Sequence, residues 1–241
     1  MKRTLFIAYS LICYALGMGI IVYLLGFIID AGLPKTIDSG TGTTSISAIA
    51  TNIALLVMFG VQHTVMAQPG FKKWWTRIMP EPIERSTYVL VTVVTFSIFF
   101  TLWQPMTKQV WNVKFEAARM TLYALYALGW FTVVLSTFLI NHFELFGLPQ
   151  AFKAMEPGAH QSKFRTPLLY KLVRHPMMAG FIIAFWSAPT MTAGHLLFSA
   201  GMTVYILIAV QIEERKLVNS FGEQYHDYRQ TTPALVPGIK L

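Results

Sequence analysis

The segment from Met177 to Ile212 contains no Asp, Glu, Lys or Arg, and this constrains the fold more than any other feature of the chain. A helix needs about 20 apolar residues to cross the ~30 Å hydrocarbon core of a bilayer, so the segment is longer than one crossing requires. Pro189 and Gly194, near its middle, predict a break. We therefore expect a helical hairpin with arms over roughly 177–188 and 195–212, of which the first is short for a full crossing.

Four more uncharged windows have the length of a crossing, at residues 4–29, 46–67, 86–103 and 120–140. Hydrophobic residues make up 54% of the chain and charged residues only 12%, whereas about a quarter of the residues in soluble domains are charged. The sequence therefore predicts an all-α membrane protein with five to six transmembrane helices, of which the last two form the hairpin.

The distribution of Lys and Arg predicts the orientation of these helices. If the N-terminus is cytoplasmic and the crossings alternate, only Lys35, Lys108, Lys114 and Arg119 of the 19 basic residues lie outside. The positive-inside rule then predicts that both termini are cytoplasmic. The net charge of +8 follows from this topology and from attraction to anionic lipid, so no nucleic acid partner is expected. The first segment is too long for a signal peptide and has no A-x-A cleavage site, so it should remain as an anchor.

Polar side chains inside apolar segments are costly, so each is a candidate site residue. Asn52, in the middle of the second window, is typical of a hydrogen bond between helices. Gln62 and His63 lie near the cytoplasmic end of the same window, and His142 and Glu144 follow the fourth window at the same depth. One shared site at the cytoplasmic side is the simplest interpretation.

Two further polar residues are candidates beside this group. Asn141 lies three residues before Glu144 and would share a helix face with it if the fourth helix continued that far. His195 falls at the far turn of the hairpin, where we expect an interface residue.

Metal binding is the main alternative for the cytoplasmic group. No His and carboxylate within it have the i, i+3 or i, i+4 spacing that would place two ligands on one helix face. Cys13 is the only cysteine, which excludes an intramolecular disulfide and a cysteine-based metal site. The sequence therefore predicts no metal.

The segment before the hairpin, RTPLLYKLVRHP, predicts a short amphipathic helix on the inner membrane surface. Thr166 is a suitable N-cap and Pro167 a suitable first helical residue. Leu168 and Leu172 lie on one face of this helix. Its end would bring Arg174 and His175 to the entrance of the hairpin.

An apolar stripe follows the hairpin. Leu217, Phe221, Tyr225 and Tyr228 are spaced i, i+4, i+8 and i+11, which predicts a helix with one apolar face that Gly222 weakens. The helix is either a docked terminal element or a lid over the mouth of the hairpin.

The order of these motifs resembles the C-terminal half of the integral-membrane methyltransferases, a family that includes isoprenylcysteine carboxyl methyltransferase and the phospholipid methyltransferases. The motifs are Arg-His-Pro at 174–176 with Gly180, and Glu-Glu-x-x-Leu-x-x-x-Phe-Gly-x-x-Tyr-x-x-Tyr at 213–228. Over most of its length, including GVQHTVMAQPGFKKWWTRIMPEPIERSTY and LINHFELFGL, the chain resembles the bacterial NnrU-like branch, and closely its methanethiol S-methyltransferases. The resemblance implies N-terminal helices over 1–145 and a methyltransferase core over 146–241 in a bacterial inner membrane, with a cytoplasmic C-terminal helix capping the cofactor pocket.

The resemblance also implies S-adenosylmethionine as methyl donor and assigns it six binding residues. These are Arg174, His175, Glu213, Glu214, Tyr225 and Tyr228. His175 would contact the amino acid end of the donor, Glu213 or Glu214 its ribose or amino group, and the tyrosines would close the pocket. Many relatives have Tyr at the position of Met178, so the contact made by that ring is absent here.

Methylation of a thiol requires that the thiol lose its proton. Burial opposes thiolate formation, whereas a nearby sulfonium favours it, so a general base would help. We hypothesise that His142 or His63 takes the proton and that Glu144 orients the imidazole.

Several alternatives remain open at the level of sequence. The acceptor could be methanethiol, which would give dimethyl sulfide, or a larger thiol, isoprenylcysteine or a lipid amine. A non-enzymatic NnrU-like membrane partner of nitrogen-oxide respiration would need no donor pocket. A transporter would place polar residues along a crossing path, and an NADPH-dependent reductase would need a Gly-rich phosphate cradle, which the sequence lacks.

Overall fold

The structure, a computed structural model, describes residues 2–40, 42, 44–152 and 164–239. Five of its helices are long and apolar enough to cross a membrane: α1 (Lys2–Ile28), α2 (Ile46–Met66), α4 (Glu81–Leu102), α5 (Glu116–Ile140) and α9 (Ala193–Phe221). The predicted class, a helical membrane protein, is confirmed. Lys153, Lys163 and Lys240, which the orientation prediction counts as cytoplasmic, lie outside the described residues.

The remaining elements are short. The helices are α3 (Pro69–Trp75), α6 (His142–Leu145), α7 (Leu148–Phe152), η1 (Leu168–Lys171, a 3-10 helix), α8 (Pro176–Trp186) and α10 (Glu223–Thr231). Two strands, β1 (Gln109–Asn112) and β2 (Thr190–Thr192), pair with each other.

The chain forms two compact units. Unit 1 lies within residues 1–108, 142–158 and 192–197, and unit 2 within residues 109–141, 159–191 and 198–241. The first five residues of α9 belong to unit 1 and the rest of that helix belongs to unit 2.

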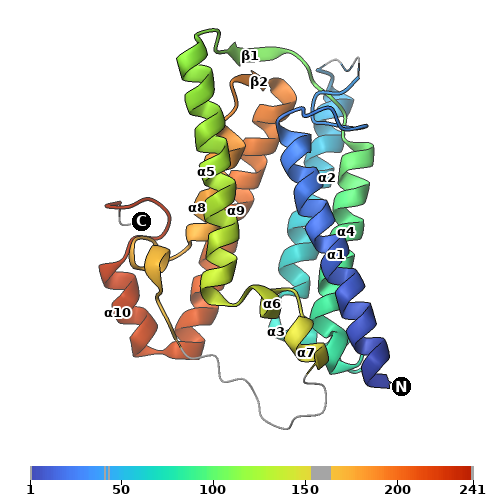
Figure 1. The fold of residues 1–241 in the computed structure, drawn as a ribbon, viewed down its shortest axis with the longest axis vertical. Helices are drawn as coiled ribbons and strands as arrows, with labels where there is room; N and C mark the ends of the chain where they lie inside the picture. The colour runs from blue at the N-terminus through green and yellow to red at the C-terminus, as the bar shows by residue number, and fades with distance from the viewer. Residues whose placement is uncertain (1, 41, 43, 153–163, 240–241) are drawn as a thin grey trace. The chain divides into compact units, whose positions relative to one another are not determined.

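In unit 1, α4 packs against both α1 and α2 (Figure 1). Aromatic rings make these interfaces: Phe100 of α4 lies 4.8 Å from Phe27 of α1, and Phe96 lies 4.6 Å from Phe59 of α2, both as ring-centroid distances. Asn52 of α2 donates to the carbonyl of Gln104 at 2.8 Å and accepts from its N–H at 2.9 Å. The amide therefore bonds the backbone just after α4 instead of a second helix.

In unit 2, α5 packs closely against α8 (Figure 1). A Cβ added at Gly129 would lie 2.7 Å from the carbonyl oxygen of Gly180, so only glycine allows this approach. The α8–α9 contact includes the Ser199 hydroxyl, which donates to the carbonyl of Phe185 at 2.7 Å.

The connection from α8 to α9 reaches the start of α5. The N–H of Val113 donates to the carbonyl of Pro189 at 2.9 Å, and the indole N–H of Trp111 donates to that of Ala188 at 3.0 Å. Residues 187–189 are buried, and these bonds satisfy backbone carbonyls that lie outside any helix.

The fourth apolar window ends at residue 140, as α5 does, and two other local predictions are wrong. The fourth helix does not continue to Glu144, because α5 ends at Ile140, Asn141 is extended and α6 begins a new turn. The predicted amphipathic helix at 166–175 is a single 3-10 turn that begins after Pro167.

The second error concerns the apolar stripe after the hairpin. Leu217 and Phe221 belong to α9, whereas Tyr225 and Tyr228 belong to α10. Gly222 separates the helices with φ +56° and ψ −131°, a conformation that glycine adopts without strain.

Candidate functional site

The site in unit 2 begins where the chain enters α8. Pro176 opens α8, and the two residues before it form backbone bonds with the segment that follows α10. The N–H of Arg174 donates to the carbonyl of Pro233 at 2.9 Å, and the N–H of His175 donates to that of Ala234 at 3.0 Å. These two bonds hold the C-terminal segment against the start of α8.

Glu214, near the end of α9, is the buried centre of an ionic cluster that we call the clasp: Arg174, His175, Glu213, Glu214 and Arg229. Glu214 Oε1 lies 2.7 Å from Arg174 Nε, 2.6 Å from Arg174 Nη2 and 3.2 Å from His175 Nε2. Its other oxygen lies 3.4 Å from Nε of Arg229. The side chains of Arg174 and Glu214 are only 3% and 9% exposed, and each compensates the other's buried charge.

Arg174 uses the rest of its guanidinium on the backbone that follows. Its Nη1 donates to the carbonyl of Arg229 at 3.1 Å and to the carbonyl of Thr232. All three of its side-chain nitrogens therefore bond protein groups, and the side chain ties α9, α10 and the start of α8 together.

Glu213 and Glu214 are neighbours in sequence but lie in different environments. The side chain of Glu213 is 47% exposed, whereas that of Glu214 is 9% exposed. Glu213 Oε2 lies 3.7 Å from His175 Nδ1, so His175 lies between the two carboxylates. Glu213 is the carboxylate of this pair with surface left to bind a ligand.

Aromatic side chains lie near the clasp. The rings of Phe164, Tyr225 and Tyr228 are 5.4 to 6.0 Å apart. Tyr225 is 2% exposed, and its hydroxyl has no hydrogen-bond partner in the described part of the chain. Burial raises the pKa of Tyr225 and raises that of Tyr228 to about 12, so both phenols are neutral at physiological pH.

A buried hydroxyl without a partner is uncommon in folded proteins, because the unmade hydrogen bond costs free energy. Tyr228 differs from Tyr225 in this respect, since its hydroxyl donates to the carbonyl of Tyr170. Tyr225 therefore has a donor and an acceptor available for a ligand.

Unit 1 holds the three residues predicted to be catalytic. His142 Nε2 lies 2.9 Å from the hydroxyl of Tyr14 in α1, and His63 Nε2 lies 2.8 Å from the hydroxyl of Tyr88 in α4. Burial lowers the pKa of His142, which favours a neutral imidazole. Glu144 lies in α6 with His142, and its backbone carbonyl accepts hydrogen bonds from Gly147 and Gln150.

The structure thus gathers the six predicted cofactor residues into one cluster of unit 2. Sequence reasoning missed Arg229 and the carbonyl of Thr232 in this cluster, and it missed the tyrosines that bond His63 and His142. Arg229 directly follows the recognised Tyr228, and Tyr14 and Tyr88 are polar residues within apolar windows. These sequence positions were the signals from which Arg229, Tyr14 and Tyr88 could have been identified.

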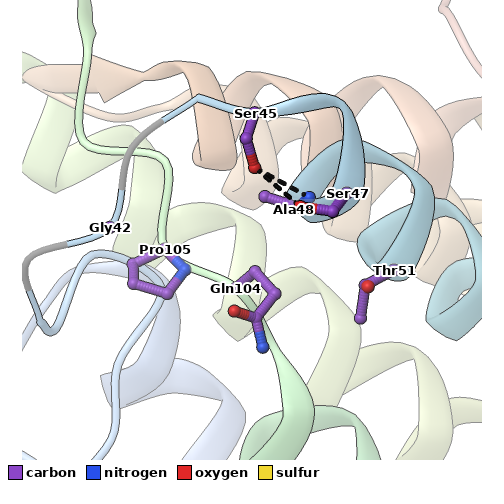
Figure 2. Close-up of a pocket in the computed structure, with 7 residues that line it drawn as sticks. All are labelled: Gly42, Ser45, Ser47, Ala48, Thr51, Gln104 and Pro105. Atoms are coloured by element: carbon purple, nitrogen blue, oxygen red, sulfur yellow. Dashed lines mark hydrogen bonds between the residues drawn. The ribbon is translucent and has the colours of Figure 1, made fainter.

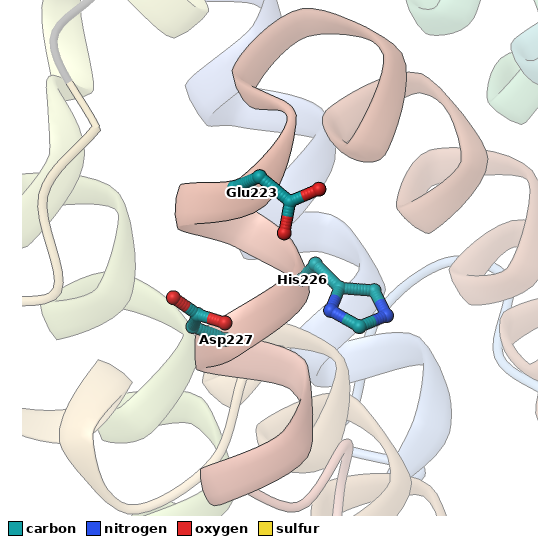
Figure 3. A group of neighbouring side chains, drawn as sticks. All are labelled: Glu223, His226 and Asp227. Atoms are coloured by element: carbon teal, nitrogen blue, oxygen red, sulfur yellow. The ribbon is translucent and has the colours of Figure 1, made fainter.

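One group with metal-ligand spacing lies on α10, where Glu223, His226 and Asp227 project from one helix (Figure 3). Their ligand atoms lie within 4.8 Å of one another, and all three side chains are exposed. The amide nitrogen of Gln230 lies 3.3 Å from His226 Nδ1. Exposed groups of this kind are common without an ion, and we assign no metal to this one.

A pocket of about 410 Å³ lies elsewhere in unit 1 (Figure 2). Its lining consists of small or neutral side chains: Gly42, Ser45, Ser47, Ala48, Thr51, Gln104 and Pro105. It contains no ionisable group and none of the predicted site residues, so it is not the candidate functional site.

The fold and the clasp together define a helical integral membrane protein with a polar, aromatic-flanked site at the junction of α8, α9 and α10. Residues 52–238 match the family model described as NnrU protein, so the chain belongs to the NnrU family. The predicted branch is confirmed. More distant similarity extends to Nurim of Xenopus laevis, 24% identical over 229 residues, which cover 86% of this chain and 80% of that protein.

Two nearer relatives carry the name methanethiol S-methyltransferase. The one from Mycobacterium tuberculosis is 47% identical over 238 residues, which cover 98% of each chain. The one from Pseudomonas deceptionensis is 46% identical over 233 residues, which cover 96% of this chain and 89% of that protein. No solved structure matches this chain.

Proposed function

We propose that this chain methylates methanethiol to dimethyl sulfide, with S-adenosylmethionine as the methyl donor. The observation that carries the proposal is its 47% identity, over 98% of both chains, to a relative named methanethiol S-methyltransferase. Sequence identity at that level over nearly the full length of both chains indicates that the two proteins share a reaction as well as a fold.

The residues of the clasp suit this donor. When bound, the donor supplies an electrophilic methyl group on a sulfonium sulfur. Glu213 has an exposed carboxylate that would accept hydrogen bonds from an ammonium or a ribose diol, and the buried Tyr225 hydroxyl lacks a partner. His175 would contact the amino acid end. Arg174 and Glu214 already bond each other, so we propose that they hold these groups in place.

The acceptor thiol must lose its proton before its sulfur can attack carbon. We propose His142 or His63 as the base. Both have Nε2 at hydrogen-bond distance from a tyrosine hydroxyl, which orients the ring. Reaction of a thiolate with a sulfonium annihilates charge, so a site of low polarity lowers the barrier relative to water. The role of Glu144 would be to orient His142.

Headspace gas chromatography tests the reaction directly. Purified full-length protein supplied with methanethiol and the donor should release dimethyl sulfide, and larger thiols should compete weakly. Calorimetry with S-adenosylhomocysteine tests the donor site separately, and Glu213→Gln should weaken that binding. If the protein bound neither S-adenosylmethionine nor S-adenosylhomocysteine, the proposal would be refuted.

We further propose that both termini lie in the cytoplasm, which the distribution of Lys and Arg supports. We also propose a bacterial inner membrane location, because the methanethiol S-methyltransferases that this chain resembles come from bacteria.

A further inference from the structure

The connection between α2 and α4, residues 67–80, has an unusual composition. It contains Lys72, Lys73 and Arg77 together with three aromatic residues, and it has no Asp or Glu. It joins two helices that are each long and apolar enough to cross a membrane. Because only 14 residues, 67–80, separate Met66 from Glu81, α3 lies at the membrane surface where both helices end.

One face of α3 is docked on unit 1. Phe71 packs against a buried cluster made of Met66, Tyr88 and Val89. The ring of Trp75 stacks on Phe71 at 5.7 Å between centroids, so it extends the docked face by one turn. This contact fixes which side of α3 is turned away from the unit.

The surface beside this docked face is apolar as well as basic, and it begins at Trp74, whose ring lies 5.3 Å from that of Phe71 between centroids. Trp74 is 49% exposed and Ile78 is 64% exposed, and they are four residues apart. Lys73 and Arg77, also four apart and exposed, lie beside them. Neither base pairs with an acid among the residues that the structure describes. One apolar face is enough to dock a short helix on the protein. A second, exposed apolar surface is therefore expected only where it contacts another apolar medium.

We propose that the face formed by Lys73 and Trp74 of α3 and by Arg77 and Ile78 of the turn that follows it binds anionic phospholipid. The bases would contact the headgroup phosphate, while Trp74 and Ile78 insert at the level where headgroups meet acyl chains. Tryptophan is enriched at that depth because its ring is apolar and its N–H is polar. Lipid suits this face better than a protein partner because the lengths of the connection and the adjoining helices already place it at the bilayer surface.

The test uses full-length protein in neutral detergent, titrated with phosphatidylglycerol while the thermal unfolding midpoint is followed. A lipid that binds the folded state raises this midpoint, and its concentration dependence gives an affinity. Lys73→Gln with Arg77→Gln should bind phosphatidylglycerol roughly 30-fold more weakly, since each base near an anionic surface contributes ~1 kcal/mol.

Three controls make the result specific. Lys73→Arg with Arg77→Lys keeps both charges and should bind like the wild type, and so should Lys108→Gln with Lys114→Gln, which removes two exposed bases elsewhere. Phosphatidylcholine and free glycerol phosphate should each leave the midpoint unchanged.

Four outcomes would overturn the proposal. The first is an unaltered phosphatidylglycerol affinity in the Lys73→Gln, Arg77→Gln double variant. The second is a shift of the unfolding midpoint by phosphatidylcholine as large as that by phosphatidylglycerol. The third is an equally large shift by glycerol phosphate, which would indicate a site for free phosphate. The fourth concerns Trp74→Ala with Ile78→Ser. If this variant changes the oligomeric state by light scattering and leaves lipid affinity intact, the face binds a second copy of the chain.

Discussion

Two adjacent glutamates show how much the surroundings of a side chain decide its role. Glu214 is buried and bonds Arg174 and His175, whereas Glu213 is half exposed and its carboxylate lies 3.7 Å from His175 Nδ1. The sequence offered both as donor ligands without distinguishing them. Because of this difference in burial, we propose a structural role for Glu214 and donor binding for Glu213.

Glu214→Ala should therefore destabilise the protein by about 3–5 kcal/mol, because it leaves Arg174 as an unpaired buried charge. Glu213→Ala should cost little stability and should weaken S-adenosylhomocysteine binding. Thermal unfolding and calorimetry on the two variants check this. Equal losses of stability would contradict the assignment.

Tyr225→Phe removes a buried hydroxyl that has no partner in the described residues. Stability should stay the same or rise, since no hydrogen bond is lost, while S-adenosylhomocysteine affinity should fall about tenfold through loss of one ligand bond. Tyr228→Phe is the matched control and should reduce stability, because that hydroxyl bonds Tyr170. If Tyr225→Phe unfolded more easily and bound normally, the hydroxyl would be structural.

The buried His142 should make the stability of the protein depend on pH. Burial lowers its pKa below the ordinary value of about 6.5, so the unfolded chain binds this proton more readily than the folded one. Its contribution to stability is complete at neutral pH and is lost as the pH falls below about 6.5. The thermal unfolding midpoint of the wild type should decrease as the pH is lowered below about 6.5. In His142→Gln, whose side chain cannot titrate, the decrease should be smaller. An equal fall in both proteins would assign the effect to other groups.

At the scale of elements, hydropathy located the long helices well and their ends poorly. The window at 86–103 corresponds to α4, which begins at Glu81, because Pro82 and the two acidic residues of the first turn suit a helix start. The arm predicted over 195–212 corresponds to α9, which continues to Phe221 although its last turns are charged. Charge ends an apolar window, but it does not end a helix.

Gly222 ends α9, and its replacement tests that role. Gly222→Ala should destabilise the protein by about 1–3 kcal/mol and weaken S-adenosylhomocysteine binding, because the backbone conformation there is strained for any residue with a Cβ. No atom lies within 4 Å of the added Cβ, so the cost is conformational. Gly19→Ala in α1, also without a neighbour within 4 Å, should be neutral or stabilising. Thermal unfolding of both variants measures the difference, and similar behaviour would be inconsistent with this account.

At the scale of the whole molecule, the short α8 raises the question of how many times the chain crosses the membrane. Its 11 residues span about 16 Å, roughly half the hydrocarbon thickness. Yet Pro189 bonds Val113 just before α5, while Tyr170, before α8, bonds the carbonyl of Ser136 near the end of α5. The segment 170–189 therefore runs alongside most of α5, partly as helix and partly as non-helical chain.

A crossing of this kind predicts that both termini lie on the same side of the membrane. Fusions of a fluorescent protein that matures only in the cytoplasm should be fluorescent at either terminus, and alkaline phosphatase, which needs export, should be inactive at both. The physical reason is that all but four of the 19 basic residues then face the cytoplasm. Fluorescence at only one terminus would mean that segment 170–189 does not complete a crossing.

The sequence by itself determined the class of protein, the apolar helices and the family, because hydropathy and short motifs are properties of neighbouring residues. Only the tertiary structure decided that all three side-chain nitrogens of Arg174 bond protein groups. It also decided which glutamate is exposed and which tyrosines bond the two histidines. Arg174 and Glu214 are 40 residues apart in the chain, and Tyr14 and His142 are 128 apart. No local pattern encodes such partners, since they meet only when the helices that carry them pack together.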